Sequence, residues 1–235
     1  MVARTELVLL PGMDGTGVLF QPLLDILPLS LVAHAQRYPT HEALSYDDLV
    51  ARVLAALPRE GDYVLVAESF SGPIALRAAA TQPRGLRALV LCASFAEAPV
   101  RVPAWLTPFV RPGLMRMSPF ALQAPVMLGM SAPASLRALL AEALAAVSPE
   151  VLAHRARELL RVDASEALSA LHVPLLYLRA TRDRLVSARS RDHLLHHCPD
   201  ATVADIQGPH LLMQAQPEAC WQAIEAFLRE RVFTG

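Results

Sequence analysis

The stretch that decides the fold is "YVLVAESFSGPIALRAAA", residues 63–80. Its apolar first part is typical of a buried strand, and the small and apolar residues from 71 onward have the spacing of a helix. Ser69 stands at the corner between the two, flanked two residues away by Ala67 and Ser71. A tight strand-to-helix turn presents a hydroxyl group while main-chain N–H groups face the developing oxyanion. The stretch therefore predicts Ser69 as a nucleophile.

Two other interpretations compete at this corner. Ser71 is a rival nucleophile, but the residue two positions after it is Pro73, and proline fits an early helical position better than the flank of a tight turn. Ser69 could also be only the N-cap of the following helix, a common role for serine after a strand. The short motif alone leaves that N-cap interpretation open, and the rest of the chain has to decide.

Short apolar runs alternate with helical segments along most of the chain, which favours a mostly parallel sheet of about six strands with helices on both faces. The sequence thus predicts an α/β protein. The predicted strands are Leu7–Leu10, Leu31–Gln36, Tyr63–Ala67, Ala88–Cys92, Leu175–Ala180 and Thr202–Ile206. The predicted helices are Leu19–Ile26, Tyr46–Leu57, Ser71–Thr81, Ala188–His197 and Pro217–Arg231.

One region breaks this alternation. Residues 97–163 contain no strand candidate, only helix-forming runs of Ala, Leu and Arg that are cut by prolines. We expect them to form a helical cap inserted into a core made of residues 1–96 and 164–235. The first four arginines of this region have no acidic residue between them. A solvated helical surface is enough to explain them. These residues are Arg101, Arg111, Arg116 and Arg137.

A nucleophilic serine needs a base and an acid that orients the base. His210 lies in "IQGPHLLMQAQPE", directly after the last predicted strand, and Asp183 lies in "YLRATRDRLV", directly after the fifth. Functional groups of an open parallel sheet gather beyond the carboxyl ends of its strands. Asp200 precedes its strand and Asp205 lies within one, so both are weaker candidates for the acid. The sequence predicts Ser69, Asp183 and His210 as a catalytic triad.

A glycine-rich turn, "LLPGMDGTG", closes the first predicted strand at residues 9–17. It could be a simple turn or a phosphate-binding loop, but it lacks the lysine of a Walker A motif. With Ser69 as nucleophile, we expect the main-chain N–H groups of Met13 and Phe70 to form the oxyanion hole.

Composition narrows the possible functions. The chain has 235 residues, 54% of them hydrophobic, and a net charge of -1, which gives no reason to expect nucleic acid as a partner. It has no lysine, which excludes Schiff-base and Ser-Lys chemistry. Three cysteines without CxxC spacing predict reduced thiols in a cytoplasmic protein. His193 and His197 lack a nearby acid, so we expect no metal and no cofactor. No apolar run approaches the length of a membrane span.

Four motifs together resemble the α/β-hydrolase superfamily over nearly the whole chain: "PGMDGTG", "AESFSGP", "ATRDRLV" and "GPHLLMQAQP". The resemblance implies an α/β-hydrolase fold with a helical cap. It also implies Ser69 as nucleophile, His210 as base, Asp183 as orienting acid, and Met13 and Phe70 as oxyanion donors. The chain departs from the family pattern at Pro11-Gly12, where relatives have His-Gly, so the bracing of that loop is expected to differ.

The expected activity is hydrolysis of small carboxylic esters through an acyl-enzyme, with apolar cap segments ("WLTPFV", "PFALQAPVMLGM") around the acyl group. A thioesterase or acyltransferase is the alternative, because the motifs also resemble plant phytyl-ester-forming acyltransferases. One version resembles the pimeloyl-carrier-protein methyl ester hydrolases, and the cap arginines would then dock an acidic carrier protein. A catalytically silent binding module is the third hypothesis.

Overall fold

The computed structural model describes residues 5–100, 110–113 and 120–233. Its described strands form one sheet in the order β2-β1-β3-β4-β5-β6, with every neighbouring pair parallel. The six-stranded parallel sheet expected from the sequence is confirmed. The strands are β1 (Thr5–Leu10), β2 (Ala33–Ala35), β3 (Asp62–Glu68), β4 (Leu86–Cys92), β5 (Leu175–Ala180) and β6 (Thr202–Ile206).

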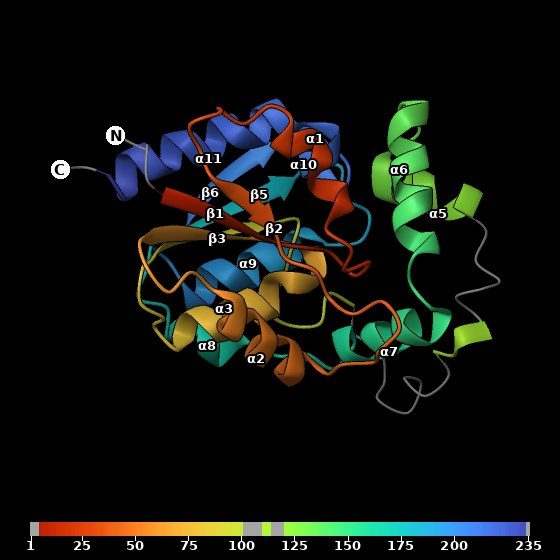
Figure 1. Cartoon of the computed structure of the whole chain (residues 1–235), viewed down its shortest axis with the longest axis horizontal. Coiled ribbons are helices and arrows are strands. Elements are labelled where there is room, and N and C mark those ends of the chain that lie inside the picture. Colours follow the sequence, from red (N-terminus) through yellow and green to blue (C-terminus); the bar gives the residue numbers. More distant parts are fainter. Residues whose placement is uncertain (1–4, 101–109, 114–119, 234–235) are drawn as a thin grey trace.

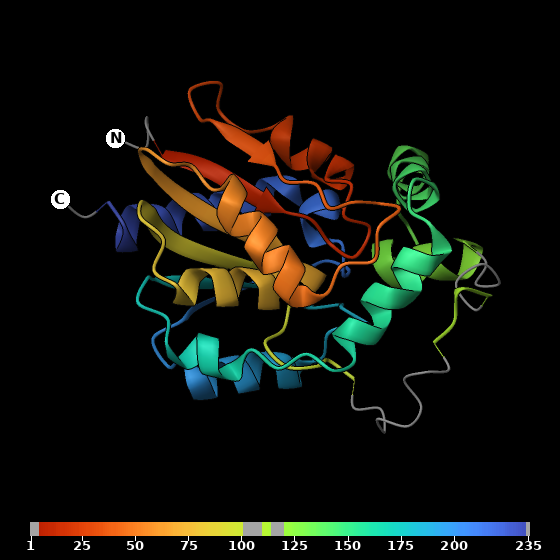
Figure 2. The ribbon, with the colours of Figure 1, turned by 60° about the horizontal axis from the view of Figure 1, so that its bottom comes forward.

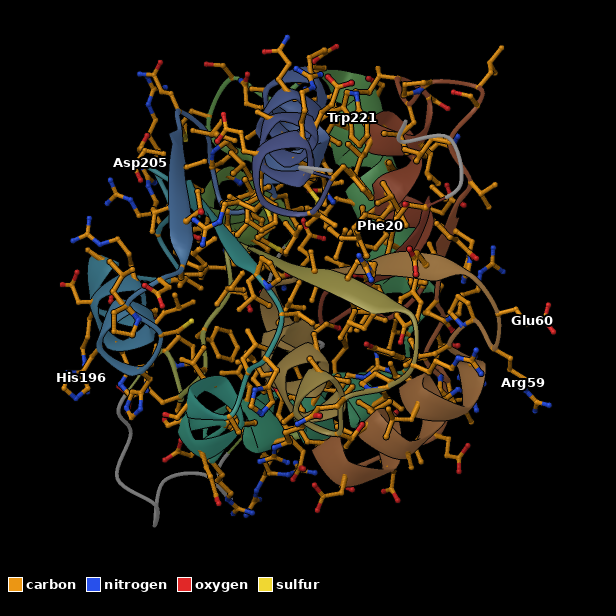
Figure 3. The ribbon with its side chains drawn as sticks, turned by 90° about the vertical axis from the view of Figure 1, so that its left-hand side faces the viewer. Phe20, Arg59, Glu60, His196, Asp205 and Trp221 are labelled. Atoms are coloured by element: carbon orange, nitrogen blue, oxygen red, sulfur yellow. The ribbon has the colours of Figure 1, made fainter. Side chains whose placement is uncertain are left out.

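Helices cover both faces of this sheet (Figure 1). Successive strand residues point to opposite faces, so Leu65 packs in one apolar cluster and Val66 in the other. One face carries α2 (Tyr46–Ala56), α3 (Gly72–Ala80), α8 (Ser165–Ser169) and α9 (Ala188–His197). The other carries α1 (Gln21–Leu24), α10 (Leu212–Ala215) and α11 (Pro217–Arg231). Figure 3 shows Phe20 and Trp221 on this second side of the sheet, where both belong to its cluster.

Three described helices of the predicted cap lie at the end of the sheet opposite the two termini (Figures 1 and 2). They are α5 (Phe120–Leu128), α6 (Ala134–Ala145) and α7 (Pro149–Leu159). Leu128 and Leu140 pack there with Leu19 and Leu211 of the core. Part of the apolar sequence expected around an acyl group, including Ala124 and Leu128, therefore packs against the core. The rest, residues 105–109, lies outside the described residues.

The chain enters and leaves this region through a short two-stranded stem. Glu97 and Asp163 form an antiparallel bridge. The Ala98 N–H donates to Val162 O at 2.9 Å, and the Ala164 N–H donates to Ala96 O at 2.8 Å. The division into core and cap stays a prediction, and this stem supports its proposed boundaries.

The structure differs from the sequence prediction at the first crossover. Strand β2 is shorter than predicted, because as an edge strand it pairs only with β1; single hydrogen bonds extend that pairing to Val32 and Gln36. The helix expected at Leu19–Ile26 is a 3-10 turn, η1 (Val18–Phe20), followed by the one-turn α1. Among the described helices, none is long and apolar enough to cross a membrane.

Candidate active site

The order of the strands reverses between β1 and β3, and the loops after these two strands meet at that point. In open α/β sheets, ligands bind at such a reversal, outside the carboxyl ends of the strands. The loop after β1 holds the glycine-rich turn, and the loop after β3 begins with Ser69. The loops after β5 and β6, which carry Asp183 and His210, open at the same edge of the sheet.

Ser69 occupies the tight turn that the sequence predicts. Its φ of 48° lies in the left-handed region, which is strained for a residue with a side chain. The Ser94 hydroxyl donates to Ser69 O at 2.6 Å. A Cβ atom at Gly72 would lie 1.9 Å from Ser94 Oγ. The absence of a side chain at Gly72 therefore allows α3 to approach close enough for Ser94 to hold this turn.

Ser69, His210 and Asp183 form a continuous hydrogen-bonded chain. His210 Nε2 lies 2.8 Å from Ser69 Oγ, and His210 Nδ1 lies 2.8 Å from Asp183 Oδ2. The side chains of His210 and Asp183 are each 4% exposed, so water competes little for these bonds. The arrangement can transfer the serine proton to the imidazole while the carboxylate stabilises the resulting cation.

The second oxygen of Asp183 is fixed by the main chain. The Leu185 N–H donates to Asp183 Oδ1 at 2.7 Å, and the Val186 N–H donates to it at 2.9 Å. The rival acid Asp205 lies in edge strand β6, where Arg179 Nε donates to it at 2.6 Å. Figure 3 shows Asp205 at the periphery of the molecule. Asp200 is exposed and precedes β6, at the opposite end of the strand from His210.

The expected oxyanion loop is a tight turn in which the Gly15 N–H donates to Gly12 O at 3.0 Å. Ser71 has a structural part here: its hydroxyl donates to Pro11 O, and it is completely buried. The Tyr38 hydroxyl lies 2.7 Å from Ser71 Oγ and, because the serine proton is already used, donates to it. Ser71 is thus a brace for this loop at Pro11.

The Met13 N–H, one of the two predicted oxyanion donors, has no main-chain acceptor among the described residues. Phe70, the other, lies in the first turn of the 3-10 helix η2 (Ser69–Ser71), where N–H groups have no acceptor within the helix. Neither group thus has a main-chain partner among the described residues, as a pair of oxyanion donors requires. Their role stays a prediction.

A buried arginine of the cap reaches the same loop. Arg155 in α7 is 2% exposed, and its Nη1 donates to Met13 O at 2.8 Å and to Asp14 O at 2.9 Å. Its Nη2 donates to Pro39 O at 2.8 Å. The sequence analysis assigned no role to Arg155. A signal was present, since Val151, Arg155 and Leu159 share one helix face at i, i+4 and i+8.

Glu68, at the end of β3, is a second buried charged residue that the sequence analysis overlooked. It is 0% exposed; Gln214 Nε2 donates to its Oε2 at 3.1 Å, whereas its Oε1 has no partner among the described residues. Burial raises the pKa of Glu68 to about 8; repulsion from Asp14 acts in the same direction and the Gln214 hydrogen bond opposes it. Glu68 is therefore largely protonated at neutral pH.

Two cavities open where the cap meets the core. One, of about 410 Å³, lies between the α5–α6 region and the loops that carry Asp183 and His210; Arg182, Arg184 and Pro209 are among its lining residues. The other, of about 440 Å³, lies beside Thr16 and Tyr38 under α6. Among the residues that the structure describes, none that lines the first cavity is acidic.

No group of three metal-binding side chains occurs among the described residues. His193 Nε2 lies 2.8 Å from Ser165 Oγ, and His197 Nδ1 lies 2.9 Å from Ser169 Oγ, so both histidines take part in packing α9 against α8. All three cysteines are free thiols; Cys92 and Cys220 are buried and Cys198 is partly exposed.

A family model described as serine aminopeptidase, S33, matches residues 40–212. That match covers most of the chain and includes all three residues of the hydrogen-bonded chain. The protein belongs to the S33 family of α/β hydrolases. This S33 hydrolase has the fold that the sequence motifs predicted, and the matched region begins after the glycine-rich loop at residues 9–17.

Solved structures agree on the fold. A malate-bound thermophilic esterase from Thermogutta terrifontis has a TM-score of 0.81 and 19% identity, over 96% of this chain and 90% of the esterase. The enol-lactonase from Burkholderia xenovorans has a TM-score of 0.80 and 15% identity, over 96% and 92% of the two chains. At these identities the likeness concerns the fold alone.

A sequence relative is larger. The polyketide synthase ThaQ of Burkholderia thailandensis is 31% identical over 249 residues, which cover 96% of this chain but only 12% of the synthase. The S33 hydrolase thus corresponds to a small segment of that much longer protein.

Proposed function

We propose that this S33 hydrolase cleaves carboxylic esters through an acyl-enzyme, with Ser69 as nucleophile, His210 as base and Asp183 as orienting acid. The observation that carries the proposal is the unbroken chain of two 2.8 Å contacts from Asp183 through His210 to Ser69. Nucleophile, base and orienting group within hydrogen-bonding reach are what acyl transfer needs.

The reaction follows from this geometry. Ser69 Oγ attacks the ester carbonyl carbon as His210 Nε2 takes the serine proton, and the N–H groups of Met13 and Phe70 stabilise the oxyanion. The carbon–oxygen bond then breaks, and His210 returns the proton to the departing alkoxide, which leaves as the alcohol. A water molecule attacks the acyl-enzyme with the same base assistance, so that the acid is released and Ser69 regains its proton.

An ester fits the surroundings better than the peptide substrate that the family description suggests. An aminopeptidase has to bind a free α-ammonium group, for which a carboxylate is the ordinary partner. Among the described residues, the cavity next to the His210 loop is lined by Arg182 and Arg184 and by no acidic residue; Ser69 and His210 are not part of this lining. That lining favours neutral or anionic substrates.

Ser69→Ala tests the proposal directly. We expect it to abolish turnover of short p-nitrophenyl esters and labelling by a fluorophosphonate, while circular dichroism shows an intact fold. Ser71→Ala is the comparison variant: it removes the neighbouring hydroxyl but leaves the Ser69 nucleophile in place, so it should slow turnover and labelling without abolishing them. Unchanged ester turnover in Ser69→Ala would overturn the assignment. A wild-type protein that neither turns over esters nor reacts with the probe would support the silent binding module instead.

A thioesterase or acyltransferase is the second candidate, and the similarity to ThaQ favours it. A thioester carbonyl is open to the same attack by Ser69, and a polyketide is an acyl chain. Comparing an acyl thioester with the oxygen ester of the same acyl group separates the two activities. If kcat/KM for the oxygen ester is at least as high as kcat/KM for the thioester, the thioesterase candidate is wrong.

Docking of an acidic carrier protein at the cap is a separate proposal within this candidate. Arg111 and Arg137 are exposed, whereas Arg101 and Arg116 lie outside the described residues. Neutralising all four should raise KM for a carrier-bound acyl group and reduce its salt dependence, with little effect on a free ester. Equal losses for both substrates would argue against docking there.

A further inference from the structure

Arg155 is the residue through which the cap holds the oxyanion loop. Its guanidinium is buried, and its hydrogen bonds go to three main-chain carbonyl oxygens, those of Met13, Asp14 and Pro39. A buried charge is tolerated only when its hydrogen-bonding groups are satisfied. Helix α7 can therefore dock in this position only if the loop presents these carbonyls, and the loop in turn receives its donors from α7.

Other hydrogen bonds hold the second half of the loop: the Tyr38 N–H donates to Gly15 O at 2.8 Å, and the Thr16 N–H donates to Asp14 Oδ2 at 2.8 Å. Ser71 holds the carbonyl of Pro11, and the Gly15 N–H holds the carbonyl of Gly12. Arg155 holds the next two carbonyls, those of Met13 and Asp14. Because a trans peptide is planar, its C=O and N–H point in opposite directions. The Gly12 carbonyl belongs to the same peptide plane as the Met13 N–H and thus sets its direction. The carbonyls that Arg155 binds belong to the next two peptide planes and limit that direction from the other side of Met13.

We propose that Arg155 is a positioning residue for the oxyanion hole, so that docking of the cap through α7 is needed for fast acyl transfer. Arg155 does not touch the substrate; it acts through the main chain of Met13. This inference rests on the proposed function, because it concerns how well the Met13 N–H stabilises the oxyanion.

Two further contacts make this arrangement specific for arginine. A Cβ atom at Gly15 would lie 2.6 Å from Arg155 Nη1, so the loop is shaped to admit the flat guanidinium. The Arg155 guanidinium also lies over the Tyr38 ring at 5.8 Å, a distance at which a cation is attracted to the ring face. Tyr38 in turn donates to Ser71, so the braces on both sides of the loop are connected.

Arg155→Met tests the proposal and Arg157→Met is its control. Arg157 lies on the same helix and donates to the Val110 carbonyl at 2.7 Å, a bond that does not involve the oxyanion loop. We expect Arg155→Met to lower kcat for a short ester about 10- to 100-fold with little change in KM, as small displacements near a reacting centre do. The rate of fluorophosphonate labelling should fall in parallel. Arg157→Met should stay within about two-fold.

Arg155→Lys is the conservative variant. A lysine ammonium can donate to one or two of the carbonyls but lacks the planar fork that reaches all three. It should recover part of the kcat lost in Arg155→Met. A purely structural role would show full recovery of activity once the melting temperature is restored, whereas a positioning role leaves a deficit in kcat in a stably folded variant.

Gly15→Ala perturbs the guanidinium from the other side. Gly61→Ala is its control, since both glycines have positive φ, 72° and 81°, but a Cβ at Gly61 meets nothing within 4 Å. Gly61 lies in the α2–β3 loop, where Figure 3 shows the neighbouring Arg59 and Glu60 pointing away from the molecule. We expect Gly15→Ala to lower kcat and Gly61→Ala to affect only stability. The double variant Gly15→Ala/Arg155→Met should lose less than the product of the two single losses.

The outcomes separate the two proposals. If the wild-type protein neither labels nor turns over esters, the proposed function fails. If it does both, and folded Arg155→Met or Arg155→Lys labels as fast as wild type, the role of Arg155 is wrong. A rise in KM at constant kcat would also overturn it, because that result means direct contact with substrate. If Arg155→Met does not fold, Arg155→Lys and the comparison of Gly15→Ala with Gly61→Ala decide.

Discussion

The two sides of Ser69 are held in different ways. On the acid side, Asp183 is fixed by N–H groups two and three residues further along its own loop, at Leu185 and Val186. On the proposed oxyanion side, the loop after β1 is held by Arg155, which lies 142 residues away from Met13 and belongs to the proposed cap. The acid side thus depends on local core structure, whereas the oxyanion side depends on a distant helix that has to dock.

This difference predicts how each side fails. Changes on the acid side should remove the chemistry while the loop stays in place. Changes on the oxyanion side should each lower kcat only partly, because several hydrogen-bonding partners hold the same loop. The predictions below test that contrast.

Asp183→Asn should give the largest effect. An amide at this position donates to the imidazole instead of accepting from it, so His210 takes the wrong tautomer and cannot act as base. We expect kcat to fall by about 10⁴-fold. Asp205→Asn is the control, because it changes the rival acid in β6, which pairs with Arg179. Steady-state kinetics on a p-nitrophenyl ester measure both, and an Asp183→Asn variant with near-normal kcat would refute the triad.

Ser71→Ala should give an intermediate effect on the other side. The Pro11 carbonyl loses its donor while Arg155 still holds the next carbonyls, so we expect kcat to fall by about 10-fold. Tyr38→Phe leaves the Ser71 bond to Pro11 intact and should lose less. The test is the order of kcat, which should be lowest for Ser71→Ala, intermediate for Tyr38→Phe and highest for the wild type. The reverse order would mean that Tyr38, and not Ser71, holds the loop.

Glu68→Gln should change how stability depends on pH. The pKa of Glu68 is about 8 in the folded protein against 4.5 for the free side chain. Between these values the folded state holds a proton that the unfolded state has lost, so stability should decrease as pH rises through this window and level off above it. At about 1.4 kcal/mol for each unit between the two pKa values, the decrease should be on the order of several kcal/mol.

Urea unfolding at pH 5 and pH 9 measures this effect, and Glu68→Gln should remove most of the difference. Glu60→Gln, in the exposed α2–β3 loop, should leave it unchanged. Asp14, which repels the Glu68 carboxylate, remains in both variants, and so does Cys92, whose pKa is raised by burial and also by Glu68. If the pH dependence of the free energy of unfolding is unaltered in Glu68→Gln, another group causes it.

Arg182→Ala/Arg184→Ala should give the smallest effect. Both residues are exposed and line the cavity beside the His210 loop. We expect KM for an ester with a free carboxylate to rise about two- to five-fold, as exposed charge pairs are weak, with a neutral ester unaffected. Arg59→Ala/Arg84→Ala makes the same charge change at a distant cavity. An equal rise in KM in both double variants would mean that the effect comes from net charge alone.

Much of this molecule could be predicted from sequence because the signals are local. The bounds of β5, β6, α9 and α11 follow from short apolar runs and helical periods that neighbouring residues alone determine. The residues brought together as Ser69, Asp183 and His210 each follow a strand, and parallel strands place their carboxyl ends at one edge.

Arg155 could not be assigned in this way, because its role depends on where α7 docks. In the sequence its position on an apolar helix face indicates burial, but only the packing of α7 on the loop after β1 reveals its partners. Ser71 was set aside as a rival nucleophile for a sound local reason, yet its partner, Pro11, lies 60 residues earlier. Nothing in the sequence distinguishes Glu68, because carboxylates are common at strand ends.

The stem at Glu97 and Asp163 has a practical consequence for engineering. Because the chain departs from and rejoins the sheet through adjacent hydrogen-bonded residues, the intervening segment could be exchanged for that of a related hydrolase without opening the core. A chimaera of this kind would keep Ser69, His210 and Asp183 untouched. It would nevertheless react slowly unless the donated segment brought a guanidinium of its own to the turn at Gly15.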